Sequence, residues 1–175
     1  MKKNKLVLSV AAAALMSFSA QAHEHEHHHM HHQGSHTQVE FSGHETELSG
    51  VEFNRCWVRL VPGGRPSAAY FDLKNNGDTA ISLIGARADN FTHVELHQTT
   101  VVDGKSMMGP LEQVLVEPGQ SATFKPKANH VMLTAESEDA VAVGDTVTLQ
   151  FKFEGEQVAS AECTVKAINA LSFDD

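Results

Sequence analysis

Short runs in which apolar and polar residues alternate, separated by turn-forming residues, fill the chain from about residue 45 onward. The clearest run is TVTLQFKF at 146–153, where Val147, Leu149, Phe151 and Phe153 share one face and the residues between them share the other. No stretch keeps a helical period for more than about two turns. A two-residue period is typical of strands that are buried on one face, so the sequence predicts an all-β fold.

Nine runs qualify as strands, and turns rich in Gly, Pro, Asn and Asp separate them. The predicted strands are 51–61, 67–75, 80–88, 92–101, 111–116, 121–125, 129–135, 146–153 and 157–168. We expect residues 45–170 to form a single β-sandwich, because roughly 125 residues are enough to enclose one hydrophobic core. Residues 171–175 are expected to form a plain C-terminal tail.

The first 22 residues have the pattern of a secretory signal peptide. Three lysines precede the apolar run LVLSVAAAALMSF, and Ala20-Gln21-Ala22 supplies a cleavage site of small residues. The apolar run is too short to span a bilayer, and no later stretch reaches a membrane-spanning length. The sequence therefore predicts an exported protein of the periplasm, without membrane insertion.

The charge balance argues against two classes of partner. The chain carries 13 Lys and Arg against 22 Asp and Glu, and removal of residues 1–22 leaves 10 basic residues and a formal charge of −12. Nucleic acids and anionic lipids bind basic surfaces. We therefore expect neither of them as a partner.

The sequence contains two cysteines, Cys56 and Cys163, which are far apart and form no CxxC motif. A redox motif or a zinc knuckle is therefore not indicated. In an oxidising compartment the two residues could form one disulfide that joins an early strand to a late one. Buried free thiols are the alternative, because sequence does not give the separation that a disulfide requires.

Residues 23–36 read HEHEHHHMHHQGSH, and we expect the polar segment 23–44 to be flexible because it cannot bury a core. Neutral imidazole is the commonest metal ligand near neutral pH. The histidines of this segment are His23, His25, His27, His28, His29, His31, His32 and His36. Cleavage after Ala22 would place His25 third from a free amine, an arrangement that suits Cu(II) or Ni(II). We interpret the segment as a secondary site for metal capture, with copper, zinc and nickel all open.

Methionine is confined to one part of the predicted domain. It occurs there only as Met107, Met108 and Met132, in the region that also contains His97 and His130. Methionine that served as general core filler would be scattered among the strands. His130 and Met132 are two residues apart on one strand, so they are expected to share a face.

Four of these residues follow the spacing His97, ten residues, Met108, twenty-one residues, His130, one residue, Met132. Two imidazoles and two thioethers suit Cu(I) better than zinc, magnesium or calcium. His97 lies in a predicted strand and Met108 in a predicted loop after Asp103-Gly104. The sequence therefore predicts that three neighbouring segments bring a Cu(I) site together at one end of the sandwich.

This spacing, with VELH at 94–97, MGPLE at 108–112 and GDTVTLQFKFE at 144–154, resembles the periplasmic copper chaperones of the PCuAC type. The resemblance covers about residues 50–168. It implies a cupredoxin-like Greek-key β-sandwich with one Cu(I) at an exposed site formed by His97, Met108, His130 and Met132. It also implies delivery of copper to the CuA centre of cytochrome oxidase, alongside a Sco-type copper-transfer protein. We expect a monomer that is not an enzyme.

The sequence departs from that family at two points. Members often carry Arg directly after the first Met, where this chain has Gly109. Members with a metal-binding extension often carry it at the C-terminus, whereas here the His-rich segment comes first.

Met107 is interpreted as a neighbour or reserve ligand. His93 has the strand parity of His97, although a surface position fits it better.

Two other functions stay open at this stage. One is a periplasmic protein for zinc or copper sequestration or storage that acts mainly through the His-rich segment. The other is a copper oxidase that uses His23 at the mature N-terminus, which would need that terminus to be rigid. A blue-copper electron carrier is disfavoured because neither cysteine is followed shortly by His or Met. No HExxH or similar motif for a hydrolytic zinc site occurs in the domain.

Overall fold

The computed structural model describes residues 38–175, so the predicted signal peptide and His-rich residues 23–36 lie outside the described part. Eleven strands occur in the described part. They are β1 (Thr46–Glu47), β2 (Val51–Arg59), β3 (Ser67–Asn75), β4 (Ile81–Ala88), β5 (Phe91–Val102), β6 (Lys105–Pro110), β7 (Val114–Val116), β8 (Ser121–Phe124), β9 (His130–Ala135), β10 (Thr146–Phe153) and β11 (Gln157–Lys166). Among these residues, none forms a helix that could span a membrane. The all-β prediction is confirmed.

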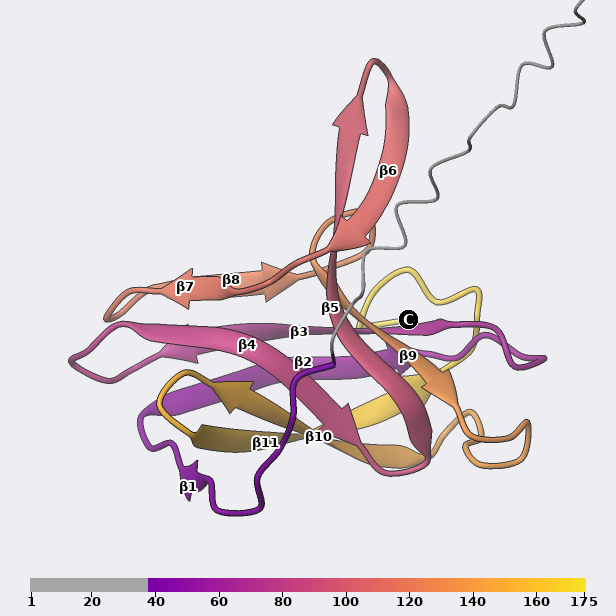
Figure 1. Ribbon diagram of the computed structural model, residues 1–175. Helices are drawn as coiled ribbons and strands as arrows, with labels where there is room; N and C mark the ends of the chain where they lie inside the picture. The colour runs from indigo at the N-terminus through magenta and orange to yellow at the C-terminus, as the bar shows by residue number, and fades with distance from the viewer. Residues whose placement is uncertain (1–37) are drawn as a thin grey trace, which may run out of the picture. The chain divides into compact units, whose positions relative to one another are not determined.

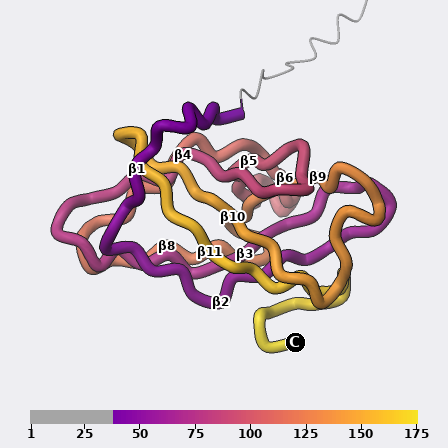
Figure 2. Tube along the Cα trace, turned by 90° about the horizontal axis from the view of Figure 1, so that it is seen from below, coloured from indigo at the N-terminus to yellow at the C-terminus, as the bar shows by residue number. Residues whose placement is uncertain are grey.

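One continuous sheet connects all the strands, in the order β6-β5-β9-β3-β2-β11-β10-β4-β7, with β1 on β11 and β8 on β3. Strands β4 and β5 stand near opposite ends of this order, yet only residues 89 and 90 join them in the chain. The sheet must therefore curl until its two ends meet, and Figure 2 shows β4 beside β5.

The curled sheet packs its two halves face to face, as the layers of a sandwich do. The rings of Phe71 in β3 and Phe151 in β10 have centroids 4.6 Å apart, although β2 and β11 separate their strands in the sheet. The predicted layers thus belong to one sheet, because β2 pairs with both β3 and β11. A bulge between Asn54 and Trp57, where Arg55 has φ 54°, lets β2 change direction.

A disulfide joins Cys56 in β2 to Cys163 in β11, with the Cα atoms 4.5 Å apart. The two residues directly precede the parallel pair Trp57 and Thr164, so the disulfide lies at the start of that ladder. Of the two sequence alternatives, the structure contains the cross-linked one. Because the cysteines have a sequence separation of 107, the cross-link ties an early strand of the domain to its last strand.

The residues that precede β1 are packed on the outside of β4 and β10. A Cβ atom at Gly85 would lie only 2.7 Å from the Cβ of Val39, so these two backbones are in close contact. The ammonium of Lys152 donates a hydrogen bond of 2.7 Å to the carbonyl of Glu40. Phe41 lies against the guanidinium of Arg87, 4.4 Å from ring centroid to Cζ. The domain thus includes residues that the sequence analysis assigned to the His-rich segment.

The last residues also pack on the domain, where the sequence suggested only a plain tail. Arg55 forms an ion pair with Asp174. The carboxylate of Asp175 accepts hydrogen bonds from the backbone N–H groups of Leu171 and Ser172, and these bonds lower its pKa. Phe173 packs against a small hydrophobic cluster, which consists of Trp57, Tyr70 and Ala170.

Candidate metal centre

Strands β5, β6 and β9 carry the four predicted ligands. His97 lies on β5, Met108 on β6, and His130 with Met132 on β9. The prediction that Met108 lies in a loop is wrong: Lys105–Pro110 pairs with β5 in a hairpin that turns at Asp103-Gly104, where both residues have positive φ. This hairpin projects from the rest of the sheet in Figure 1.

The strand register brings the four side chains to one face. His97 is directly opposite His130, and Glu95 is directly opposite Met132. Met108 is opposite Thr99, two residues after His97 on β5. Because directly paired residues share a face and residues two apart share it too, all four predicted ligands are on the same side of the sheet. The alternate residues Val131 and Leu133 are fully buried in the core on the other side.

His130 and Met108 are in contact. The Nδ1 of His130 lies 3.0 Å from the carbonyl oxygen of Ala128, which can only accept a hydrogen bond, so Nδ1 carries the proton. In the neutral ring the other nitrogen, Nε2, then has a free lone pair, and it lies 3.2 Å from the sulfur of Met108. Two electron-pair donors that face each other in this way suit a soft cation.

The surroundings of His130 favour its neutral form. Burial lowers its pKa below the usual 6.5, the bond to Ala128 opposes this, and the charges of His97 and Arg59 lower it further. A neutral imidazole is the form that binds metals. His130 is therefore ready to act as a ligand at neutral pH.

His97 is held by a carboxylate. Its Nε2 lies 3.2 Å from Oε2 of Glu95, and its Nδ1 is buried without a hydrogen-bond partner among the described residues. The centroids of the His97 and His130 rings are 5.8 Å apart. The two imidazoles are thus neighbours on one face.

A cavity of about 380 Å³ adjoins Met108, His130 and Met132, and its wall also contains Arg59 and Lys127. The guanidinium of Arg59 donates a hydrogen bond to the hydroxyl of Tyr70. Burial raises the pKa of Tyr70, although the charge of Arg59 acts in the opposite direction. The rim of the site is therefore basic in a chain whose overall charge is acidic.

Exposure differs sharply among the four residues. The imidazoles of His97 and His130 are buried, whereas Met108 is 60% exposed. Met107 is 57% exposed, but it is opposite Thr100 and therefore on the other face of the hairpin. His93 is exposed and contacts Thr92, 3.1 Å from Nδ1 to Oγ1. The structure thus groups Met108, and neither Met107 nor His93, with the other predicted ligands.

Sequence reasoning did not single out Glu95 or Arg59. The sequence did contain a signal for Glu95: it is two residues before His97, and this spacing places both side chains on one face of a strand. Nothing in the sequence marked Arg59, since its position depends on the pairing of β2 with β3. Within residues 38–175, no three or more His, Cys, Asp or Glu side chains are grouped so as to hold a metal.

The fold and the site together define an all-β domain that presents two imidazoles and two thioethers on one face of a curled sheet. Residues 51–165 match the family described as "Putative lipoprotein LpqE-like". This match covers about two thirds of the chain, so the protein belongs to the LpqE-like family.

The chain is also similar to one known protein in sequence and to solved structures in fold. A protein of Leifsonia xyli subsp. xyli, described as "Putative lipoprotein Lxx21020", is 24% identical over 121 residues, which are 69% of this chain and 72% of that protein. The apo PCuAC domain of PmoF2 is similar in fold, with a TM-score of 0.58 and 22% identity over 74% of this chain and 99% of that domain.

The Cu(I) form of DR1885 from Deinococcus radiodurans has a TM-score of 0.51 and 26% identity over 72% of this chain and 83% of that one. The resemblance to the PCuAC family that the sequence indicated is confirmed. The lipoprotein description and the disulfide agree on a location outside the cytoplasm.

Proposed function

We propose that this protein is a periplasmic copper chaperone, that it binds one Cu(I) through His97, Met108, His130 and Met132, and that it is not an enzyme. One observation carries the proposal: the lone pair on Nε2 of His130 faces the sulfur of Met108 at 3.2 Å. Two neutral thioethers and two neutral imidazoles hold a monovalent ion without accumulating negative charge, and soft sulfur selects Cu(I). The Cu(I) form of DR1885, which shares the fold, supports the choice of metal.

The exposure of Met108 supports a role in transfer. A metal that is held by buried histidines and one exposed thioether can be approached by an acceptor before the last ligand leaves. The basic rim at Arg59 and Lys127 would favour an acceptor with an acidic surface. We propose that the acceptor is the CuA subunit of cytochrome oxidase, reached directly or through a Sco-type protein, and that the chaperone acts as a monomer.

The His-rich residues 23–36 would capture additional Cu(II) or Zn(II). Cys56 and Cys163 are bonded to each other, as cysteines of exported proteins usually are. This agrees with a protein that acts in the periplasm. The alternative, a sequestration protein that acts mainly through the His-rich segment, differs in where the tightly bound copper resides.

The decisive experiment is a competition titration with Cu(I), under anaerobic reducing conditions, on protein that lacks residues 23–36. We expect one tightly bound equivalent. Met108→Leu with Met132→Leu should weaken binding by at least about 1.4 kcal/mol, which is tenfold in Kd. Leucine keeps the volume of the side chains and removes only the sulfur. Unchanged affinity in the double variant would refute the site, and loss of all tight binding on deletion of 23–36 would favour sequestration.

Delivery needs a separate test, because a protein can bind Cu(I) without transferring it. Cu(I)-loaded protein would be mixed with a purified soluble CuA domain in its apo form, and transfer would be followed over time. Lys127→Glu should slow transfer, since it reverses a charge beside the site. Lys74→Glu, an exposed residue of β3 that does not line the cavity, is the matched control. Equal rates for both variants would argue against docking at the basic rim.

A further inference from the structure

We propose that Glu95 is a positioning residue of the copper site: it holds the Nε2–H of His97 and thereby presents Nδ1 of that ring to the metal. His130 is held the other way round and presents Nε2. The two histidines would then bind one copper ion through different ring nitrogens. This inference rests on the proposed function, because it assigns atoms within the same site.

The hydrogen bonds of the two rings differ in a way that fixes their tautomers. At His130 the backbone carbonyl of Ala128 accepts from Nδ1. At His97 the carboxylate of Glu95 lies 3.2 Å from Nε2, and a carboxylate oxygen accepts hydrogen bonds. Each neutral ring carries one proton, so the free lone pair is on Nε2 of His130 and on Nδ1 of His97.

Burial provides a second and independent observation. The side chain of His97 is 9% exposed, and its Nδ1 is one of two buried side-chain atoms without a hydrogen-bond partner in residues 38–175. Buried polar atoms in folded proteins are nearly always paired, and an unpaired one calls for an explanation. A metal bound at Nδ1 would supply the missing partner. His97 is directly opposite His130 on β9, so the side chain that carries this nitrogen belongs to the face of the other predicted ligands.

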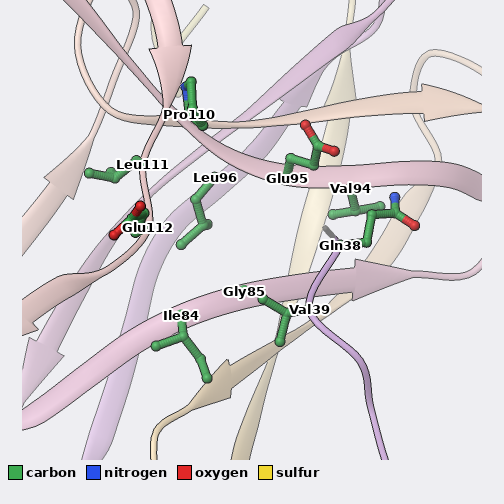
Figure 3. A pocket seen from close by; sticks show the side chains of 10 residues that line it. All are labelled: Gln38, Val39, Ile84, Gly85, Val94, Glu95, Leu96, Pro110, Leu111 and Glu112. Carbon is green, nitrogen blue, oxygen red and sulfur yellow. The ribbon is translucent and has the colours of Figure 1, made fainter. Parts of the chain in front are cut away.

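The position of Glu95 in the fold makes it suited to this role. It is two residues before His97 on β5 and directly opposite Met132, so its side chain is on the ligand face. It also forms part of the wall of a cavity of about 330 Å³ between β4 and β5, together with Gln38, Leu96 and Glu112 (Figure 3). Its side chain is only 17% exposed, so water competes little for the bond to His97.

In this role Glu95 determines the affinity for Cu(I) without being a ligand. A carboxylate that accepts the second N–H of a ligating histidine fixes the ring and increases its basicity, and loss of such a partner typically weakens metal binding about 10–100-fold. Glu95→Ala should therefore weaken Cu(I) binding by this factor. Glu95→Gln keeps an oxygen that can accept the bond, so it should restore much of the affinity.

The direct test uses the full chain labelled with ¹⁵N and long-range NMR spectra of the histidine rings. Before copper is added, we expect a proton on Nε2 of His97 and on Nδ1 of His130. One equivalent of Cu(I), which is diamagnetic, should shift Nδ1 of His97 and Nε2 of His130. Assignment of the ring resonances to individual histidines distinguishes His97 and His130 from the histidines of residues 23–36. Glu112→Ala is the matched control, because it removes a carboxylate from the same cavity without a bond to either ring.

The outcomes separate this inference from the proposed function. A copper-induced shift at Nε2 of His97, or full affinity in Glu95→Ala, would overturn the role of Glu95 and leave the copper site itself intact. A weakening of equal size in Glu112→Ala would also overturn it, because the effect would then come from charge and not from positioning. Absence of any shift at His97 and His130 with Cu(I) would refute both proposals.

Discussion

The Nε2 of His130 lies 3.2 Å from the sulfur of Met108, although the two residues belong to different strands that do not pair with each other. Strand β5 separates them in the sheet, and the β5–β6 hairpin brings Met108 over the edge of the buried histidine. The contact groups Met108, and not its neighbour Met107, with the predicted ligand His130.

Met108 and Met107 form a natural pair for a test, since they are adjacent and similarly exposed but lie on opposite faces of β6. We expect Met108→Leu to weaken Cu(I) binding by about 1.4 kcal/mol or more, tenfold in Kd, and Met107→Leu to leave it unchanged. A competition titration of both variants measures the difference. Equal losses would show that the two sulfurs are interchangeable and that the register of β6 does not select the ligand.

Stability should depend on pH through His130. Its pKa is lowered in the folded protein, so the unfolded chain takes up the proton first as the pH falls. The free energy of unfolding of the metal-free protein should therefore be fully maintained above pH 6.5 and should decrease below it, through the folded pKa of His130. Urea unfolding at pH 8, 6.5 and 5 measures this change. His130→Gln should have a shallower pH dependence, and an unaltered slope in that variant would contradict the assignment.

Loss of the disulfide should destabilise the domain. Cys56 and Cys163 close a loop with a sequence separation of 107, and removal of a native disulfide of this kind typically costs about 2–5 kcal/mol. We expect Cys56→Ser with Cys163→Ser to lower the free energy of unfolding by about this amount. The unaltered protein unfolded under reducing conditions is the control. A double variant as stable as the oxidised protein would show that the cross-link contributes nothing.

The contact between Val39 and Gly85 should anchor the residues before β1. A Cβ at position 85 would lie 2.7 Å from that of Val39, so Gly85→Ala should lower the free energy of unfolding by about 1–3 kcal/mol. Val39→Ala in the same chain should recover part of the loss. Gly109→Ala is the control, because a Cβ there would meet nothing within 4 Å. Chemical denaturation compares the variants, and equal effects at the two glycines would show that the contact is unimportant.

Much of the strand pattern could be read from the sequence. The bounds of β3 and β10 were predicted to the residue, since strong turn signals flank both strands and the apolar and polar positions of β10 alternate clearly. The pair Thr46–Glu47 and the strand Lys105–Pro110 were missed. The first has two residues, and the second is exposed along nearly all of its length, so neither carries an alternating pattern.

The sequence by itself determined which residues share a face within one strand, and it singled out four predicted ligands through their chemistry and spacing. His130 and Met132 share a face because strand geometry makes alternate side chains point the same way. Only the tertiary structure decided which strands are neighbours. It decided that Met108 contacts His130 while Met107 lies on the other face of its strand. It also decided that Cys56 meets Cys163 and that Glu95 holds His97. Those relationships depend on register between segments that are distant in the chain, and register is set by turns and by packing across the core, which local alternation does not encode.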